Sequence, residues 1–465
     1  PPTARTKKLC AAALRDFDLC FMGTIDSFCE MILNEHPSEA AIPSEAMVQT
    51  DGDLDGFYRQ RFAFILHGDY GPDLQAYAKA FQSFTRRPEE AFTRGISTLM
   101  RNRNFSFEYE PIDLPDIEAS FGGDLGDFSS AVHLLVSHPE FAYNNNADSR
   151  EAWGRIKDVD RALRGIWSRD YQNVIYNLGL LVSIRLEAAA LVDHAPTLGP
   201  FFEPHVGRGS WLDCTIGRSG GLIDKMENAR YRVSMTFLEK CIPVLEQELR
   251  DAGLLSFFDC QYYLRNMLRE DAAKGGTLIA YIANKHRYYL VDEFQDTNPI
   301  QSEIIYYLAA KDPVPDWSAC TPRPGALFIV GDPKQSIYRF TGADIGSYLR
   351  VKKLFAKNGG IVATLTRNFR SAQILCEYYN RVFPKLLPAS TATQSKYDEI
   401  PVVPISASAN TLFEGIYKYE ANKTTNPGLL ADIITGLVNN PAYQIPEETG
   451  SSNTRPIRYR DFMVI

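Results

Sequence analysis

The chain has 465 residues, of which 45% are hydrophobic and 23% charged, and its formal net charge at pH 7 is −8. This is an ordinary globular composition, and the length allows roughly two to four domains. No apolar run approaches the roughly 20 residues that cross a bilayer, and no signal peptide is visible, so no membrane partner is expected. The acidic balance gives no support for nucleic-acid binding, although it leaves open a basic groove on an acidic body.

The eight cysteines are scattered along the chain. They form no Cys-x-x-Cys pair, and no cluster of histidines accompanies them. This spacing favours reduced structural thiols over a metal site or a disulfide framework. A reducing cytoplasm is therefore the expected location.

The first half of the chain is predicted to be helical. Residues 1–33 have a mostly helical pattern around the stretch from Gly23 to Cys29, and residues 34–250 contain helical patterns separated by polar and Gly/Pro-rich loops. One of these helices, over residues 226–249, is expected to break at Pro243. With no run of strands, residues 34–250 are interpreted as a large all-helical insertion. An independent helical domain is the alternative that the sequence leaves open.

The pattern changes after Leu255. Residues 257–269 form a predicted helix, whose apolar face consists of Tyr263, Leu264, Met267 and Leu268. Buried apolar strands are then predicted at residues 288–291, 326–330 and 361–365, and each leads into a helix. Strands that alternate with amphipathic helices predict an α/β fold with a parallel sheet, in which a ligand lies beyond the carboxyl ends of the strands. The tail is predicted to contain a helix over residues 429–438 and a last strand that ends the chain.

The helices after the first and third of these strands have clear sequence signals. The first should have Asn298 as its N-cap, Pro299 in its first turn and Gln301 at the capping-box position. Its predicted apolar face consists of Ile300, Ile304, Ile305 and Leu308. The helix after the third strand should bury Ile374, Leu375, Tyr378 and Val382.

Two adjacent carboxylates, Asp292 and Glu293, follow the first predicted strand. Mg²⁺ keeps most of its waters and takes one or two carboxylates, while an adjacent acid can orient or deprotonate an attacking water. A solvated pair of acids at a strand end is the plainer interpretation. A magnesium site is favoured by the residues that follow, which are Gln295, Asp296, Thr297 and a capped helix.

A second polar cluster, from Gly331 to Phe340, follows the second strand. Gln335 offers an amide able to contact a terminal phosphate. Tyr338 and Phe340 flank Arg339, a pattern suited to stacking on unpaired bases beside a charged backbone. The alternative is a turn followed by aromatic residues that pack in the core.

The third cluster, Asn368 to Ser371, lies where the third strand is expected to meet its helix. The guanidinium of Arg370 could reach a γ-phosphate there, as an arginine finger does. A surface ion pair is the commoner role of a single arginine and remains the alternative.

In their order and spacing the three clusters resemble the UvrD/Rep family of superfamily 1 DNA helicases. Residues 292–297 resemble that family's Walker B motif, and residues 23–29 resemble its single-strand contact motif. Residues 255–259 are similar to the RecB/AddA helicase-nuclease branch. The resemblance implies RecA-like parallel-sheet motor domains with a large all-helical insertion. The implied division is residues 1–33 and 251–355 for the first motor domain, 34–250 for the insertion, and 356–465 for the truncated start of a second motor domain.

The resemblance also implies an activity and its site residues. The activity would be ATP-driven translocation and 3′-to-5′ unwinding of DNA in repair or recombination. The cofactors would be ATP and Mg²⁺, and the partners would be single-stranded and duplex DNA together with a second helicase-nuclease subunit. By family analogy, Asp292 would hold Mg²⁺ partly through water and Glu293 would activate water. The other implied contacts are the γ-phosphate for Gln335 and Arg370, the adenine for Phe369, and single-stranded DNA for Thr24, Tyr338 and Phe340.

The sequence departs from the family pattern in four ways. Asp26 and Thr341 stand where the family commonly has His and Arg, and the late motifs that carry a further arginine are missing. No Gly-x-x-x-x-Gly-Lys-[Ser/Thr] phosphate loop occurs in the 465 residues. We therefore expect an incomplete motor, a fragment without the Walker A loop, that is inactive alone. The alternatives are a non-catalytic DNA-binding or scaffold subunit with a degenerate helicase fold, and an ATPase that does not act on DNA.

Overall fold

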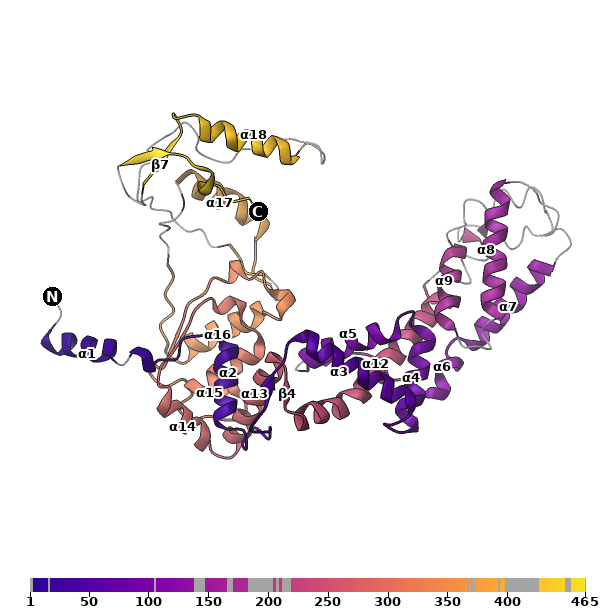
Figure 1. Cartoon of the computed structure of the whole chain (residues 1–465), viewed down its shortest axis with the longest axis horizontal. Helices are drawn as coiled ribbons and strands as arrows, with labels where there is room; N and C mark the ends of the chain where they lie inside the picture. The colour runs from indigo at the N-terminus through magenta and orange to yellow at the C-terminus, as the bar shows by residue number, and fades with distance from the viewer. Residues whose placement is uncertain are drawn as a thin grey trace. The chain divides into compact units, whose positions relative to one another are not determined.

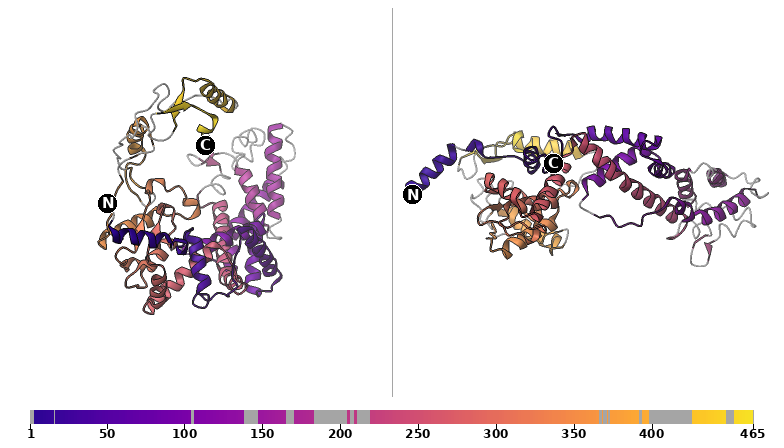
Figure 2. Two further views of the ribbon diagram at one scale, coloured as in Figure 1. Left: turned by 60° about the vertical axis from the view of Figure 1, so that its left-hand side comes forward. Right: turned by 90° about the horizontal axis from the view of Figure 1, so that it is seen from below.

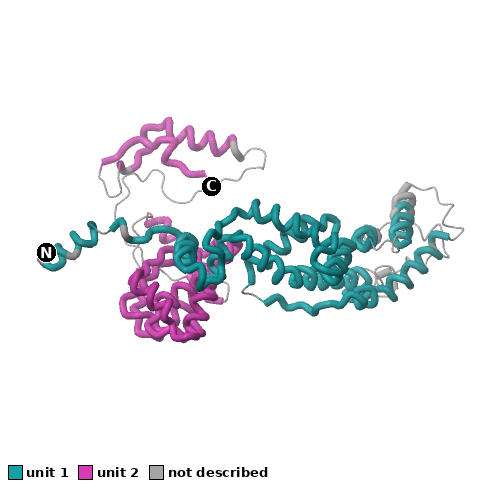
Figure 3. Tube along the Cα trace, turned by 60° about the horizontal axis from the view of Figure 1, so that its bottom comes forward, with its two compact units in different colours: residues 1–264 teal, residues 265–465 magenta. Residues whose placement is uncertain are grey.

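The computed structural model divides into two compact units, residues 1–264 and 265–465, which are coloured separately in Figure 3. The residues that it describes are 3–15, 17–103, 106–137, 147–164, 170–182, 204–205, 209–210, 219–365, 368, 371, 373–391, 394–397, 426–447 and 453–464. None of the helices within these ranges is long and apolar enough to cross a membrane.

The first unit is mainly helical, as predicted. Its helices are α1 (Ala4–Arg15), η1 (Phe17–Leu19), α2 (Ile25–Glu35), α3 (Asp51–His67), α4 (Pro72–Phe84), α5 (Pro88–Arg101), α6 (Leu114–Ala119), α7 (Gly122–Ser137), α8 (Ala147–Arg164), α9 (Tyr171–Val182), α12 (Leu222–Asp251) and the start of α13 (Phe257–Ala273). Two short strand pairs accompany them: β1 (Met47–Val48) runs parallel to β4 (Leu254–Leu255), and β2 (Pro204–His205) runs antiparallel to β3 (Gly209–Ser210). The status of residues 34–250 as an insertion remains a prediction.

The long helix α12 organises the core of this unit. It packs against α4 and α5, and α3 packs against the same two helices, which Figures 1 and 2 show from three sides. Aromatic side chains fill the space between these helices. The ring of Phe62 stacks on that of Phe92 with 4.7 Å between the ring centroids, and the ring centroids of Phe237 in α12 and Phe81 lie 5.3 Å apart. Burial of this apolar surface is the main source of stability for a helical body of this kind.

Helix α12 runs unbroken through Pro243, so the predicted break there is wrong. Proline removes one helical hydrogen bond and strains the preceding turn. Around it, Cys241, Leu245 and Leu249 are buried in the core of the unit. We attribute the continuous helix to this packing, which outweighs the local cost of the proline.

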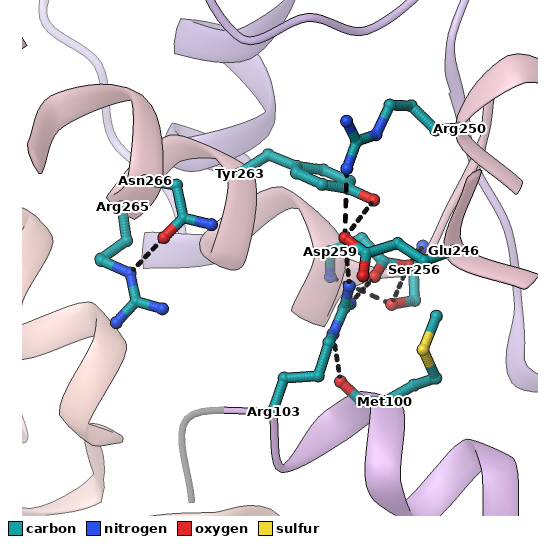
Figure 4. Close-up of polar contacts among 9 residues, drawn as sticks. All are labelled: Met100, Arg103, Glu246, Arg250, Ser256, Asp259, Tyr263, Arg265 and Asn266. Atoms are coloured by element: carbon teal, nitrogen blue, oxygen red, sulfur yellow. Dashed lines mark hydrogen bonds and ion pairs between the residues drawn. The ribbon is translucent and has the colours of Figure 1, made fainter. Parts of the chain in front are cut away.

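A buried ionic cluster joins α12 to the start of α13, and Figure 4 shows its residues. The guanidinium of Arg103, just after α5, is ion-paired with Asp259 of α13 and lies 3.2 Å from Glu246 of α12. Asp259 also accepts hydrogen bonds from the backbone N–H and the hydroxyl of Ser256, both at 2.7 Å. Burial alone would lower the pKa of Arg103, but the two carboxylates raise it above its ordinary value.

The second unit contains the predicted parallel strands. Strand β5 (Tyr289–Val291) pairs in parallel with β6 (Leu327–Ile329), with Leu290 opposite Phe328. The helices are the rest of α13, α14 (Thr277–Lys285), η6 (Phe294–Asp296), α15 (Pro299–Ala309), η7 (Trp317–Ala319), η8 (Pro333–Gln335), η9 (Arg339–Thr341), α16 (Ile345–Lys357), α17 (Gln373–Leu386), α18 (Asn426–Asn439) and η11 (Tyr459–Asp461). A short antiparallel pair, β7 (Gln444–Pro446) and β8 (Thr454–Pro456), lies near the C-terminal end.

Helix α15 begins as its sequence predicts. The side chain of Asn298 accepts the N–H of Gln301 at 2.9 Å, and the side chain of Gln301 accepts the N–H of Asn298 at 3.1 Å. Together they form the expected capping box, with Pro299 in the first turn. The four predicted apolar residues of this helix and the four of α13 are all buried. Helices α14 and α16 pack against α15, so a small α/β core forms around it.

Four predictions for this unit are wrong. Residues 361–365 form no strand, and Ile361 and Leu365 are exposed by 91% and 85%; no described strand pairs with them, and an unpaired strand has no ladder to hold it. In α17 the buried residue is Cys376, whereas Ile374 is 43% exposed. Residues 461–464 also lack a strand. Strand β5 is only partly buried, since Tyr289 is 9% exposed and Leu290 is 76% exposed.

Candidate nucleotide and DNA site

The first two polar clusters come together at the carboxyl ends of β5 and β6, as the sheet predicts. The hydrogen bonds between the two strands continue beyond their ends. The N–H of Val330 donates to the carbonyl of Val291 at 2.9 Å, and the N–H of Phe294 donates to the carbonyl of Val330 at 2.9 Å. The chain segments that begin with Asp292 and Gly331 are therefore held side by side.

The carboxylates of Asp292 and Glu293 lie on the surface at this edge. Asp292 accepts the N–H of Glu293 at 2.9 Å, and Glu293 has left-handed backbone angles of φ 49° and ψ 42°. For a residue other than glycine, such angles cost roughly 1–3 kcal/mol and are enriched at functional sites. These backbone angles turn the chain sharply after β5, and the two acids lie one after the other at this turn.

One buried amide links the two clusters. The side chain of Gln295 is 2% exposed; its nitrogen donates to a carboxylate oxygen of Glu293 at 2.7 Å, and its oxygen accepts the N–H of Asp332 at 2.9 Å. The hydroxyl of Ser336 adds a further link by donating to the backbone carbonyl of Gln295 at 3.1 Å. In the sequence, Gln295 stands out only as one of the polar residues that follow the two acids, and nothing there assigns its side chain a contact with Asp332.

Asp332 organises the second cluster. One of its carboxylate oxygens accepts the N–H of Lys334 at 3.0 Å and lies 3.0 Å from the Lys334 ammonium, while the other accepts the side-chain amide of Gln335 at 3.2 Å. Burial acts to raise the pKa of Asp332, but these donors hold it below its ordinary value. The carboxylate is thus ionised at neutral pH and orients the exposed Gln335.

Asp296 is a third acid at this edge. Burial, with a contribution from the Glu293 carboxylate, raises its pKa above the ordinary value, and the hydrogen bond from Gln295 opposes that rise. Its Oδ1 atom is buried and has no hydrogen-bond partner within the described part of the chain. The Asp296 carboxyl group is therefore harder to ionise than a free one.

Tyr338 and Phe340 do not pack in the core. Their side chains are 44% and 84% exposed, and their ring centroids lie 5.9 Å apart. The turn η9 between Tyr338 and Gly342, which has φ 98°, holds both rings outward. Exposed aromatic faces next to Arg339 have the form of a stacking platform for bases.

No group of three or more His, Cys, Asp or Glu residues is arranged to hold a metal ion within the described ranges. A closed metal cage is not needed for Mg²⁺, which commonly binds through one or two carboxylates, several waters and substrate phosphates. The surface carboxylate of Asp292 fits that mode of binding.

The region around this site matches a known family. Residues 220–356 match the UvrD/REP helicase N-terminal domain. One relative, an ATP-dependent helicase/nuclease subunit from Bacillus cereus (strain B4264), is 29% identical over 240 residues, which is 46% of this chain and 18% of that protein. The proteins of the same name from Bacillus anthracis and Bacillus thuringiensis (strain Al Hakam) give the same identity and coverage.

In the matched region this chain is similar to the UvrD-like helicases of superfamily 1. The predicted resemblance, including its similarity to the AddA branch, is therefore confirmed. The alignment spans less than a fifth of the length of these curated relatives.

Other site residues expected of a UvrD-like helicase are placed as follows. Thr24 is exposed and caps α2 by accepting the N–H of Ser27 at 3.1 Å. Asp26, in the first turn of α2, accepts the side-chain amide of Gln261 at 2.6 Å. Phe369 and Arg370 lie outside the described residues, and nothing tests their predicted roles. The roles of Thr24 and of the acids likewise remain predictions.

Five of the described cysteines are buried. The described thiols are free: Cys10 and Cys20 are exposed, and the buried ones are Cys29, Cys241, Cys260, Cys320 and Cys376. Burial raises the pKa of Cys29 and Cys241, so that both stay protonated and poorly reactive.

Proposed function

We propose that the protein carrying this chain is an ATP-dependent DNA helicase or translocase of DNA repair or recombination that moves 3′ to 5′. The observation that carries the proposal is the hydrogen-bonded link between Glu293 and the Asp332–Gln335 segment at the edge of the parallel strands. The match to UvrD-type helicases supports it. In RecA-like domains a nucleotide lies at such an edge.

The cofactors proposed are ATP and Mg²⁺. When bound, Mg²⁺ would neutralise charge on the phosphates. Asp292 would hold it, partly through water. Glu293 would orient the attacking water and accept its proton, and the amide of Gln335 would donate to the terminal phosphate. Phe369 and Arg370 are proposed to contact adenine and the γ-phosphate by family analogy.

Single-stranded and duplex DNA are the proposed substrates, with Thr24, Tyr338 and Phe340 on the single strand. Replacing both Tyr338 and Phe340 with alanine should weaken single-strand binding by about 10-fold or more, since each stacked base contributes roughly 1–3 kcal/mol. Fluorescence anisotropy with labelled oligothymidylate would measure this. Because both side chains are exposed, the fold should be unaffected.

Tyr459→Ala provides the matched control for this pair, because Tyr459 is also exposed, by 58%, outside the two clusters. It should bind DNA like the wild type. Equal affinities for all three proteins would show that Tyr338 and Phe340 do not stack on bases.

The proposed function is tested by measuring ATP hydrolysis by the full-length gene product with and without single-stranded DNA. Duplexes with 3′ or 5′ overhangs then give the polarity of unwinding. Hydrolysis stimulated by DNA, with unwinding from the 3′ overhang, is expected. No hydrolysis under either condition would refute the enzyme, and hydrolysis indifferent to DNA would indicate an ATPase that does not act on DNA.

The polypeptide of these 465 residues should itself show negligible DNA-stimulated ATP hydrolysis. No Gly-x-x-x-x-Gly-Lys-[Ser/Thr] loop occurs in it, and such a loop supplies the amides and the lysine that hold the β- and γ-phosphates. A phosphate-release assay beside the full-length protein would show the difference. Robust hydrolysis that Glu293→Gln abolishes would overturn this expectation.

One alternative is a non-catalytic protein that binds or scaffolds DNA, and a full-length protein that itself has no phosphate loop would favour it. DNA binding by the full-length protein without ATP binding would support it.

We further propose that the partner is a second helicase-nuclease subunit, because the relatives are named as subunits. The proposed location is a reducing cytoplasm, because the described thiols are free.

A further inference from the structure

We propose that Gln295 is a positioning residue that holds the water-activating Glu293 and the phosphate-contacting Gln335 in one fixed arrangement. This inference rests on the proposed function and deepens it. It assigns a role to a side chain that would touch neither nucleotide nor DNA but hydrogen-bonds to both segments of the site.

The contacts form a continuous path across the sheet edge. From Gln335, the side-chain amide donates to Asp332 at 3.2 Å. The backbone N–H of Asp332 then donates to the side-chain oxygen of Gln295 at 2.9 Å, and the nitrogen of Gln295 donates to Glu293 at 2.7 Å. Three hydrogen bonds thus connect the two groups expected on either side of a terminal phosphate.

The chemistry of this path requires an amide at position 295. Its two ends have opposite needs, because Glu293 offers an acceptor and the N–H of Asp332 is a donor, and an uncharged amide satisfies both. A carboxylate there could still accept from Asp332 but would face Glu293 with a like charge. The side chain is 2% exposed, so water has little access to replace a lost bond.

The backbone around Gln295 leaves little freedom for another arrangement. A Cβ atom built on Gly331 would lie 2.7 Å from the side-chain oxygen of Gln295 and 3.1 Å from the backbone nitrogen of Phe294. The absence of a side chain at Gly331 is what lets the two segments approach. The strained backbone of Glu293 then places its carboxylate next to the Gln295 amide.

A shift in the position of Gln335 on phosphate binding or release would therefore alter the position of Glu293. A shift of Glu293 would likewise alter the position of Gln335. Loss of Gln295 should lower the rate of the chemical step more than the affinity for nucleotide, because a misplacement of about 1 Å in a catalytic group can cost roughly 100-fold in rate. A residue with only a structural role would lower stability without this split between kcat and KM.

The experiment uses the full-length gene product and steady-state ATP hydrolysis with saturating single-stranded DNA. The two test variants are Gln295→Met, which removes both hydrogen bonds, and Gln295→Glu, which keeps the acceptor for Asp332 but cannot donate to Glu293. Each should lower kcat by about 10- to 100-fold while KM for ATP changes by less than about 3-fold. Because Gln295→Glu keeps the link to Asp332, it tests the inference even if Gln295→Met fails to fold.

Ser302→Ala is the matched control. It removes a different hydrogen bond in the same unit, the one that the buried Ser302 hydroxyl donates to the backbone carbonyl of Asn298, and leaves the path to Glu293 intact. Its kcat should stay within about twofold of the wild type even if its unfolding midpoint falls. If the Gln295 variants match Ser302→Ala in kcat, the inference is wrong.

A double-mutant cycle separates this inference from the proposed function. If Gln295 acts through Glu293 and Gln335, the loss of kcat in Gln335→Ala should be smaller in the Gln295→Glu background than in the wild type. Fully additive losses would overturn the inference while leaving the helicase assignment intact. A wild-type protein without DNA-stimulated hydrolysis would instead refute the proposed function, and the inference with it.

Discussion

Replacing Glu293 with glutamine is expected to lower kcat for ATP hydrolysis by the full-length protein by about 10²–10⁴-fold. That is the usual contribution of a positioned group that takes a proton in the transition state. Glutamine keeps the size and the oxygen of glutamate but cannot accept a proton from water. Phosphate release with and without single-stranded DNA measures the effect.

The substitution should leave the fold and nucleotide binding intact. The amide nitrogen of Gln295 can donate to a glutamine oxygen as it does to the carboxylate, and glutamine meets the same left-handed backbone that Glu293 already adopts. The side chain is exposed, so no core contact is lost. Binding of a fluorescent ATP analogue should therefore match the wild type while turnover is lost.

Glu270→Gln is the control for this substitution, since it makes the same chemical change on an exposed face of α13, where Glu270 pairs loosely with Lys274 at 3.9 Å. It should hydrolyse ATP at the wild-type rate. If Glu293→Gln retained wild-type turnover, Glu293 would not activate water, and the plainer interpretation of a solvated acid pair would stand.

The sequence predicted the elements whose signals are local. The capping box at Asn298 and Gln301 and the buried faces of α13 and α15 follow from short-range rules, and they are confirmed. The wrong predictions concern segments whose structure depends on other parts of the chain. Residues 361–365 are apolar enough for a strand but have no described strand beside them, and the helix through Pro243 is continuous because core packing surrounds it.

The candidate site, too, could be predicted from the sequence only where the signals are local. The acids, Gln335 and the aromatic pair could be chosen from residue type and spacing at the strand ends. The linking role of Gln295 could not be predicted, because it depends on the distance between two chain segments that are far apart in sequence. Its partner Asp332 and the crowded Gly331 likewise become meaningful only when β6 lies beside β5.

Replacing Asp259 with alanine should destabilise the helical unit by roughly 3–5 kcal/mol, the usual cost of breaking a buried ion pair. The side chains of Arg103 and Asp259 are 7% and 6% exposed, so water cannot replace the lost partner (Figure 4). The change also removes both hydrogen bonds from Ser256 at the start of α13. Amide hydrogen exchange in α12, whose core-facing residues report the opening of this unit, would measure the loss.

Two further variants identify the cause of that loss. Asp73→Ala breaks an exposed ion pair with Lys240, 3.0 Å long, and should cost at most about 1 kcal/mol. The double variant Arg103→Met with Asp259→Leu removes both charges together and should be less damaging than Asp259→Ala, because no buried charge is left alone. If the double variant were as unstable as the single one, the packing of α13 or its cap, and not the unpaired guanidinium, would account for the loss. Recovery of stability would show that the penalty lies in the stranded charge of Arg103, which also stacks on Tyr262 at 4.3 Å.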